Sequence, residues 1–143
     1  IPLAWWKSVL RVPGVEFVSL QYTDADADID STNAAGYEIL KAPEANADDY
    51  YETARLVASC DLVISVCTSI IHLAGALGVP AWVMVPNKPA WRYGVSGGMP
   101  WYRSVRLYRQ PKGGAEAWLP VVQRVGFDLD ELVHGEQRIE RIA

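Results

Sequence analysis

The chain of 143 residues has the length of one ordinary domain, and its 50% apolar and 21% charged residues can form a sizeable core, which excludes disorder as a description of the whole. Its net charge of −4 makes the phosphate backbone of a nucleic acid a poor partner, and no apolar run approaches the roughly 20 residues of a membrane span. Because the chain opens with Ile1-Pro2 rather than with methionine, we expect it to be a piece of a longer or trimmed polypeptide.

The first third of the chain predicts one helix, one strand and a loop. Apolar residues at three-and-four spacing predict a helix over Leu3 to Leu10, which Pro13-Gly14 ends. The mixed apolar run Val15 to Leu20 predicts a strand near the edge of a sheet. The stretch from Tyr22 to Ala35 has aspartates at alternate positions but lacks the glycine and glutamate of a calcium loop, so we interpret it as a flexible acidic loop.

The middle of the chain alternates helical and strand patterns. A helix is predicted from about Asp48 to Ser59. Two continuous apolar runs, Leu62 to Val66 and Ala81 to Val85, are typical of strands covered on both faces of a parallel sheet. Between them, a helix that Thr68 or Ser69 can cap runs to Gly78, its C-terminal stop.

The last third predicts a loop, an outer strand and a final helix. The segment Asn87 to Gly98 is rich in Pro, Gly, Trp and Arg and is predicted to be a loop, and Ser104 to Tyr108 is predicted to be a strand near an edge. A helix over about Ala115 to Val125 completes the alternation. This order predicts an α/β, Rossmann-like three-layer domain over residues 1–133 with a mostly parallel sheet, followed by a polar tail over residues 134–143.

Two cysteines give an expectation about the compartment. Cys60 and Cys67 flank a predicted strand, so their Cα atoms lie roughly 20 Å apart if that run is extended. A disulfide requires about 5.5 to 6 Å. We therefore expect free thiols and a reducing, cytoplasmic environment.

The junction between the strand at residues 62–66 and the helix that follows it is the best candidate anion site. Ligands of parallel sheets collect outside the carboxyl ends of strands, where a following helix offers unpaired N–H groups. Thr68 and Ser69 can donate to a phosphate oxygen, and His72 shares their face of the first turn. The alternative, a capped helix with a hydrogen-bonded structural histidine, stays open.

Further candidates lie at other predicted loops and strand ends. Trp91 and Arg92 could stack on a base or pair with phosphate, or they could form an ordinary surface loop with a buried indole. Gln21 ends the first predicted strand, and Tyr51 begins the helix before Asp61, where it is either a ligand contact or a core residue. Arg109, on the predicted outer strand, is interpreted as solvated. No spacing of metal ligands is apparent.

The chain also resembles a known family. The stretch from Asp61 to Pro80 resembles the donor-site signature of the heptosyltransferase-like glycosyltransferases, glycosyltransferase family 9, and is closest to the variant at the C-terminus of tetratricopeptide-repeat proteins. The similarity continues through Trp91-Arg92, Pro100-Trp101-Tyr102 and Arg106 to Gln110, and it covers roughly residues 2 to 125. This resemblance implies the C-terminal, donor-binding half of a two-domain GT-B glycosyltransferase.

The resemblance implies roles for several residues. Thr68, Ser69 and His72 are expected at the diphosphate and sugar of a nucleotide-diphosphate sugar, a donor substrate that needs no separate cofactor, and Tyr51 near its base and ribose. Cys67 stands where the family usually has aspartate. An N-terminal acceptor domain or partner chain, and the first strand of the sheet, are expected upstream, so the fragment alone should be inactive.

The alternative to a transferase is a non-catalytic relic of the fold that serves as a scaffold or partner-binding module, with a homodimer as one form of it. A sugar-nucleotide enzyme of another class, such as an epimerase, and a Cys-His hydrolase also stay open.

Overall fold

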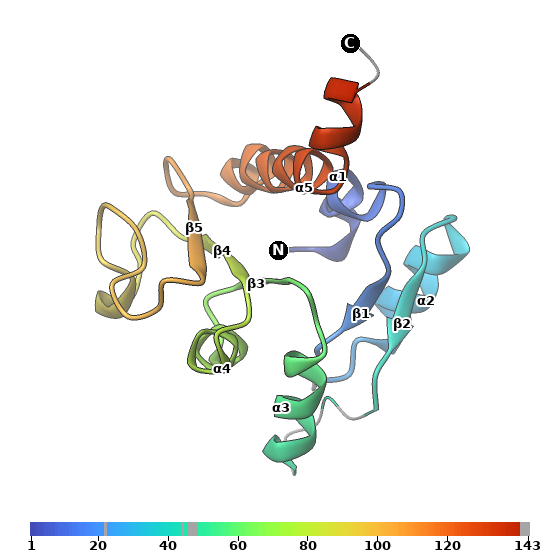
Figure 1. The fold of residues 1–143 in the computed structure, drawn as a ribbon, viewed down its shortest axis with the longest axis horizontal. Helices are drawn as coiled ribbons and strands as arrows, with labels where there is room; N and C mark the ends of the chain where they lie inside the picture. Colours follow the sequence, from blue (N-terminus) through green and yellow to red (C-terminus); the bar gives the residue numbers. More distant parts are fainter. Residues whose placement is uncertain (22, 44, 46–48, 141–143) are drawn as a thin grey trace.

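A computed structural model describes residues 1–21, 23–43, 45 and 49–140, with side chains up to residue 135. In chain order the elements are η1 (Leu3–Trp5), α1 (Lys7–Leu10), β1 (Phe17–Ser19), α2 (Asp26–Ala34), β2 (Ile39–Lys41), α3 (Tyr50–Ala58), β3 (Val63–Val66), α4 (Ser69–Leu77), β4 (Ala81–Val85), η2 (Trp91–Tyr93), β5 (Val105–Arg109), η3 (Ala115–Trp118) and α5 (Leu119–Glu140) (Figure 1).

All strand pairs are parallel. The strands β1 and β2 pair with Val18 opposite Leu40, and β3, β4 and β5 form a second sheet in that order with Ile64 opposite Trp82. All five residues of β4 are buried, as the continuous apolar run predicts for a strand with neighbours on both sides. Within the described residues, β1 and β5, which the sequence predicts near an edge, each have one strand neighbour.

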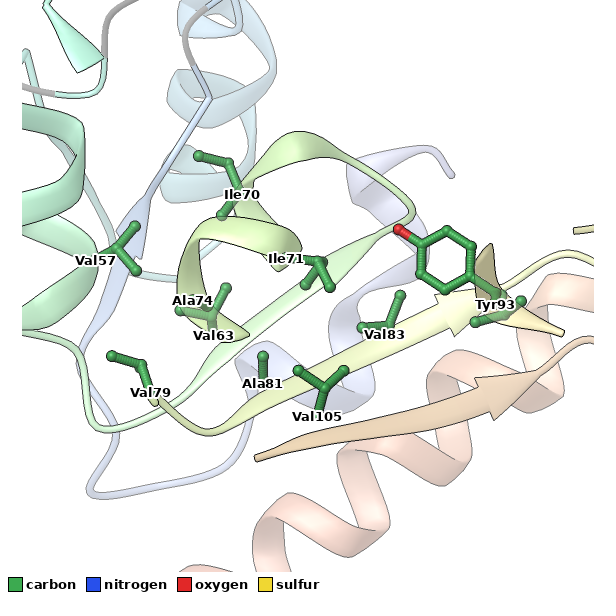
Figure 2. Packing of buried hydrophobic residues seen from close by; sticks show 11 residues of the cluster. Val57, Val63, Ile70, Ile71, Ala74, Val79, Ala81, Val83, Tyr93 and Val105 are labelled. Carbon is green, nitrogen blue, oxygen red and sulfur yellow. The ribbon is translucent and has the colours of Figure 1, made fainter. Parts of the chain in front are cut away.

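One face of the sheet carries α3 and α4. Val63, Val83 and Val105 of the strands pack there against Val57 of α3 and Ile71 of α4 (Figure 2). The two helices contact each other, and α4 ends at Gly78, whose φ of 75° is the left-handed conformation that glycine allows.

The opposite face carries α1, α5 and α2. Trp82 and Met84 of β4 pack there against Val9 of α1 and Val122 of α5, and α1 contacts α5 directly (Figure 1). Lys41 of β2 forms ion pairs with α2 and is opposite Ser19, which lies on the same face as Phe17 of this cluster. Because α2 also contacts η1, it lies on this face as well. Helices therefore cover both faces of parallel strands, and the predicted Rossmann-like three-layer architecture is confirmed.

The acidic stretch after β1 differs from its prediction. Residues 26–34 form a helix rather than a flexible loop. The strand β2, which the sequence analysis did not predict, follows it. Asp26 and Asp28 lie in the first turn, where carboxylates stabilise the positive end of the helix, and Ile29 is buried beneath it. Lys41 then joins Asp26 at 3.4 Å and Asp30 at 2.8 Å, so a residue of the next strand holds this helix. Tyr22 lies outside the described residues.

The two terminal helices also differ from their predictions. The first is split into η1 and α1, and α5 runs to Glu140 rather than ending near Val125, so it enters the predicted polar tail. Residues 141–143 of that tail, and Asp48 at the predicted start of α3, lie outside the description. Cys60 and Cys67 are unpaired with each other and are free, as predicted. Within the described part of the chain, no helix combines the length and apolar character needed to cross a membrane.

Candidate functional site

The carboxyl ends of β3, β4 and β5 meet at one edge because the three strands are parallel. The segments that follow them are the β3–α4 turn, the loop from Pro86 to Ser104 that contains η2, and the segment from Gln110 to Gly114. In a doubly wound domain this edge is the usual place for a ligand. The candidate site is built from residues of the first two segments, of the first turn of α4 and of the end of β5.

Tyr93 is the centre of this edge. It is fully buried, and its hydroxyl lies 3.4 Å from His72 Nε2 and beside Cys67, whose thiol donates to the Met84 carbonyl oxygen at 3.8 Å. Figure 2 shows the hydroxyl directed toward the β3–α4 turn. The rings of His72 and Tyr93 lie 5.8 Å apart. The fold thus brings together Cys67 and His72, two predicted site residues, around a tyrosine that the sequence analysis missed.

The acid–base character of this cluster is weak at neutral pH. Burial raises the pKa of the Cys67 thiol, and the opposing effects of the Tyr93 hydroxyl and of the charges of Arg92 and Arg109 do not cancel that rise. Burial, and next the neighbouring Cys67, raise the pKa of Tyr93 to about 12. Both groups are therefore protonated near neutrality. A thiol in this state is a poor nucleophile, so the cluster does not favour a Cys-His hydrolase.

Arg109 fixes the loop that carries Tyr93. From the end of β5, its guanidinium donates to the carbonyl oxygens of Tyr93 at 2.6 Å, Gly94 at 3.0 Å and Gly97 at 3.1 Å. The prediction that this arginine is solvated is wrong, because the fork of N–H donors satisfies carbonyls of a loop that has no regular partner. The loop is thereby closed over the sheet edge.

The N-terminus of α4 lies at the same edge. Thr68 takes the N-cap position with an extended backbone, but its side chain forms no capping hydrogen bond; its Oγ1 lies 3.3 Å from Ser65 Oγ instead. Ser69 is exposed, and the first turn contains no acidic residue. In the described part of the chain, the opening N–H groups of α4 thus have no side-chain acceptor.

Arg92 is a second source of positive charge at this edge. Its guanidinium carbon lies 5.6 Å from the centroid of the Tyr93 ring, and its charge acts on Cys67. Cys67, Thr68, Ser69, His72 and Arg92, predicted from separate positions, therefore lie around one edge.

Trp91 points away from this cluster. Its indole is 78% exposed and meets Trp101 edge to face at 6.0 Å, while Trp101 Nε1 donates to the carbonyl oxygen of Arg92 at 2.9 Å. The buried indole of the alternative is therefore wrong, because Trp91 is exposed. Stacking of Trp91 on a base stays a prediction.

Gln21 and Tyr51 lie at other places in the fold. Gln21 lines a hollow of about 570 Å³ at the carboxyl ends of β1 and β2, together with Ser19 and Lys41, whose charge Asp26 and Asp30 neutralise. Tyr51 is 72% exposed at the start of α3, which Asp49 caps by accepting from the Tyr51 N–H at 2.9 Å. Neither residue is brought into the Tyr93 cluster by a described contact.

Gly75, a glycine inside α4, marks a close contact with Tyr102 that the sequence could have indicated. The Tyr102 ring lies directly over Gly75 of α4, so that a β-carbon there would overlap it, and it meets His72 edge to face at 5.8 Å. A glycine inside a helix is costly and often marks such a close approach. Among the described residues, no group of three or more His, Cys, Asp or Glu could hold a metal ion.

Comparison with known proteins gives one relative. No protein-family model matches the chain, and no solved structure matches it. The curated protein named "Protein FlbA" from Caulobacter vibrioides is 38% identical over 134 residues, which cover 90% of this chain and 21% of that protein. The chain thus spans about a fifth of the length of the curated relative it matches.

These findings correct the family expectation. The resemblance to glycosyltransferase family 9 is wrong: no family model supports it, and the relative that the chain does match is called FlbA and not a glycosyltransferase. The expectations of a heptosyltransferase-like transferase and of a GT-B half fall with it. The Rossmann-like architecture stands on the structure alone.

Proposed function

We propose that this domain binds a nucleoside diphosphate, either free or joined to a sugar, with its diphosphate at the N-terminus of α4. The observation that carries the proposal is the opening turn of that helix, which has neither a side-chain cap nor an acidic residue and lies at the carboxyl edge of the parallel sheet β3–β4–β5. Helix N-termini at this place bind phosphate through backbone N–H groups and the helix dipole.

The charges around the turn support an anionic ligand. Arg92 lies beside the cluster, and the hydroxyls of Thr68 and Ser69 and the ring of His72 offer further donors at the same turn. The protonated states of Cys67 and Tyr93 add no competing negative charge. We propose binding alone, since the raised pKa values leave neither the Cys67 thiol nor the Tyr93 hydroxyl ionised at neutral pH.

The experiment is a thermal melt with a panel of nucleoside diphosphates and their sugar conjugates. We expect at least one to raise the Tm, and we expect Ser69→Asp to remove the shift, because a carboxylate in the first turn of α4 occupies the place of the anion. This substitution should not destabilise the unliganded domain, since it suits the helix dipole. The loss of the shift would therefore report on binding rather than on folding.

The matched control is Tyr50→Asp, which places the same carboxylate at the first residue of α3, another nine-residue helix. This variant should keep the ligand-induced shift. If no compound of the panel moves the Tm of the parent chain, or if both variants respond to ligand as the parent does, the proposal fails. Which member of the panel is bound distinguishes a free diphosphate from a sugar conjugate.

A partner-binding role is the second candidate, and the exposed aromatic pair favours it. Trp91, Trp101 and Val95 are 78%, 57% and 88% exposed on the loop that borders the same edge. Apolar surface of this kind often marks an interface. Light scattering should then show a dimer or complex that Trp91→Ser weakens, in a chain whose Tm responds to no nucleotide.

We also propose a cytoplasmic location, on the ground of the two cysteines. Both thiols are free and half-buried. Free thiols are typical of proteins in a reducing environment, which supports a cytoplasmic location.

A further inference from the structure

Two strands inside this fold each have an edge without a partner. Within the described residues, β1 pairs only with β2, and β3 pairs only with β4. The apolar run from Leu62 to Val66, which contains β3, is typical of a strand with neighbours on both sides, and it carries none of the charges, prolines or bulges that protect natural sheet edges. The edge of β3 is therefore built as an interior strand.

The hydrogen bonds of β3 show which of its backbone N–H groups point away from β4. The Val63 N–H donates to the Pro80 carbonyl at 2.9 Å, so Val63 faces β4. Because N–H groups alternate along a strand, those of Ile64 and Val66 point to the other edge.

The same reasoning applies to β1. Asn33 of α2 takes both backbone groups of Ile39, which leaves Leu40 to face β1. Since Val18 is opposite Leu40, the ladder uses its neighbours, and the backbone of Val18 points away from β2.

The two unpaired edges border the same part of the core. Phe17 of β1 and Ile64 and Val66 of β3 pack against one hydrophobic cluster, and Ile1 packs against it as well. On the other face, Leu20 joins the cluster that contains Val63. Figure 1 shows the N-terminal end of the chain between β1 and β3. Residues on both faces thus connect the two strands across a position where no strand of the described chain lies.

The handedness of the crossovers identifies what belongs there. Parallel strand–helix–strand units are right-handed in nearly all cases. The unit β1–α2–β2 has its helix on the α1/α5 face and moves away from β3. Because α1 lies on this same face and leads into β1, a strand that precedes α1 must lie on the opposite side of β1 from β2, which is the side toward β3.

We propose that the position between β1 and β3 is filled by one parallel β-strand from the polypeptide that directly precedes Ile1 in a longer natural chain. The strand would pair with Val18 on one side and with Ile64 and Val66 on the other. It would join the two sheets into one, in the order β2, β1, added strand, β3, β4, β5. Its residues would be apolar on both faces, because helices cover both.

The comparisons agree with a longer natural chain, since the matched stretch is only 21% of the curated relative. The added strand also separates β1 and β3 by about two interstrand spacings, or roughly 9.6 Å, which accounts for the absence of direct pairing between them in the described residues. This inference is independent of the ligand proposed above.

Amide hydrogen exchange tests the proposal on the full natural polypeptide, read by mass spectrometry with fragmentation to single residues. We expect the Val18 and Ile64 amides to exchange as slowly as those of Val63 and Ala81, whose partners are present in the structure. In the chain cut to begin at Ile1, Val18 and Ile64 should exchange faster by about 100-fold or more than in the full polypeptide.

Three results would overturn the proposal. The first is fast exchange of Val18 and Ile64 in the full polypeptide while Val63 and Ala81 remain protected, because β1 and β3 would then be true edges. The second is slow exchange in the cut chain that depends on protein concentration, which would assign the position to a second copy. The third is a gene that encodes no residues before Ile1.

Discussion

At the scale of single residues, the candidate site depends on groups that burial keeps neutral and on one arginine that shapes a loop. Tyr93 lies fully buried between Cys67 and His72, and Arg109 fixes the loop around it through carbonyl oxygens. These contacts join positions 67, 72, 93 and 109, which are far apart in sequence. Their chemistry therefore depends on the fold and can be tested one side chain at a time.

The pKa of Tyr93 predicts a pH dependence of stability. Its folded-state pKa of about 12 lies above the ordinary value of 10.0, so the neutral side chain contributes stability that is complete below pH 10 and is lost as the pH rises toward 12. The loss should be about 2 to 3 kcal/mol in the free energy of unfolding. Urea titrations at pH 9 to 12 should show it, and Tyr93→Phe should flatten this part of the profile. An equally steep profile in the variant would show that other groups cause the loss.

Arg109→Lys tests the role of the guanidinium. The substitution keeps the charge but loses the planar fork that reaches several carbonyls at once, so we expect the free energy of unfolding to fall by about 1.5 to 3 kcal/mol. Denaturant unfolding measures this effect. Arg103→Lys, at an exposed arginine, is the control and should change stability by less than about 0.5 kcal/mol. Equal effects of the two substitutions would contradict the role given to Arg109.

At the scale of elements, the close packing of α1 on α5 holds one helical layer together. A β-carbon on Gly126 of α5 would lie 2.5 Å from the Ser8 carbonyl oxygen of α1, and the Ser8 hydroxyl donates to the Val122 carbonyl at 3.1 Å. Glycine at this position thus lets two backbones approach.

Asp128 connects α5 to the sheet through polar contacts. It accepts from the Tyr108 hydroxyl at 3.0 Å and forms an ion pair with Arg106 at 2.6 Å. Both partners lie on β5, so α5 is joined to the outer strand by charge as well as by packing.

Gly126→Ala should destabilise the domain although alanine favours helices. The added methyl group meets backbone, which cannot move without separating α1 from α5, so we expect a loss of about 2 kcal/mol or more in the free energy of unfolding. Gly135→Ala, on the same helix, meets only the end of the Glu131 side chain at 4.0 Å and should instead stabilise by about 0.5 to 1 kcal/mol. Thermal or denaturant unfolding of the two variants gives the comparison. If both variants are stabilised, the close approach is not as tight as described.

At the scale of the whole molecule, the proposed ligand site and the position of the proposed strand are neighbours. A doubly wound sheet binds its ligand where the strand order reverses. In the joined sheet that we propose, the order would reverse between the added strand and β3. The position of the proposed strand is thus next to the N-terminus of α4. If the exchange experiment finds the strand, the nucleotide melts with the Ser69→Asp and Tyr50→Asp variants are best repeated in the full polypeptide, where both edges are paired.

The sequence by itself determined the parts of the fold that short windows encode. The continuous apolar runs at β3 and β4 and the stop of α4 at Gly78 were predictable, because two-sided burial and the left-handed helix end each require particular residues locally. The same windows placed Thr68 and Ser69 at a helix N-terminus. They did not reveal α2, whose nine residues show no apolar stripe and which Lys41 holds from the following strand.

Only the tertiary structure decided what gathers around that helix terminus. The contacts of Tyr93 with Cys67 and His72, and of Arg109 with its loop, join residues separated by up to 26 positions, and no local pattern specifies such pairs. It also removed Gln21 and Tyr51 from the cluster and showed that β1 and β3 each lack a neighbour. The physical reason is that local patterns fix which residues are buried or capped, while the choice of partner depends on how distant elements pack.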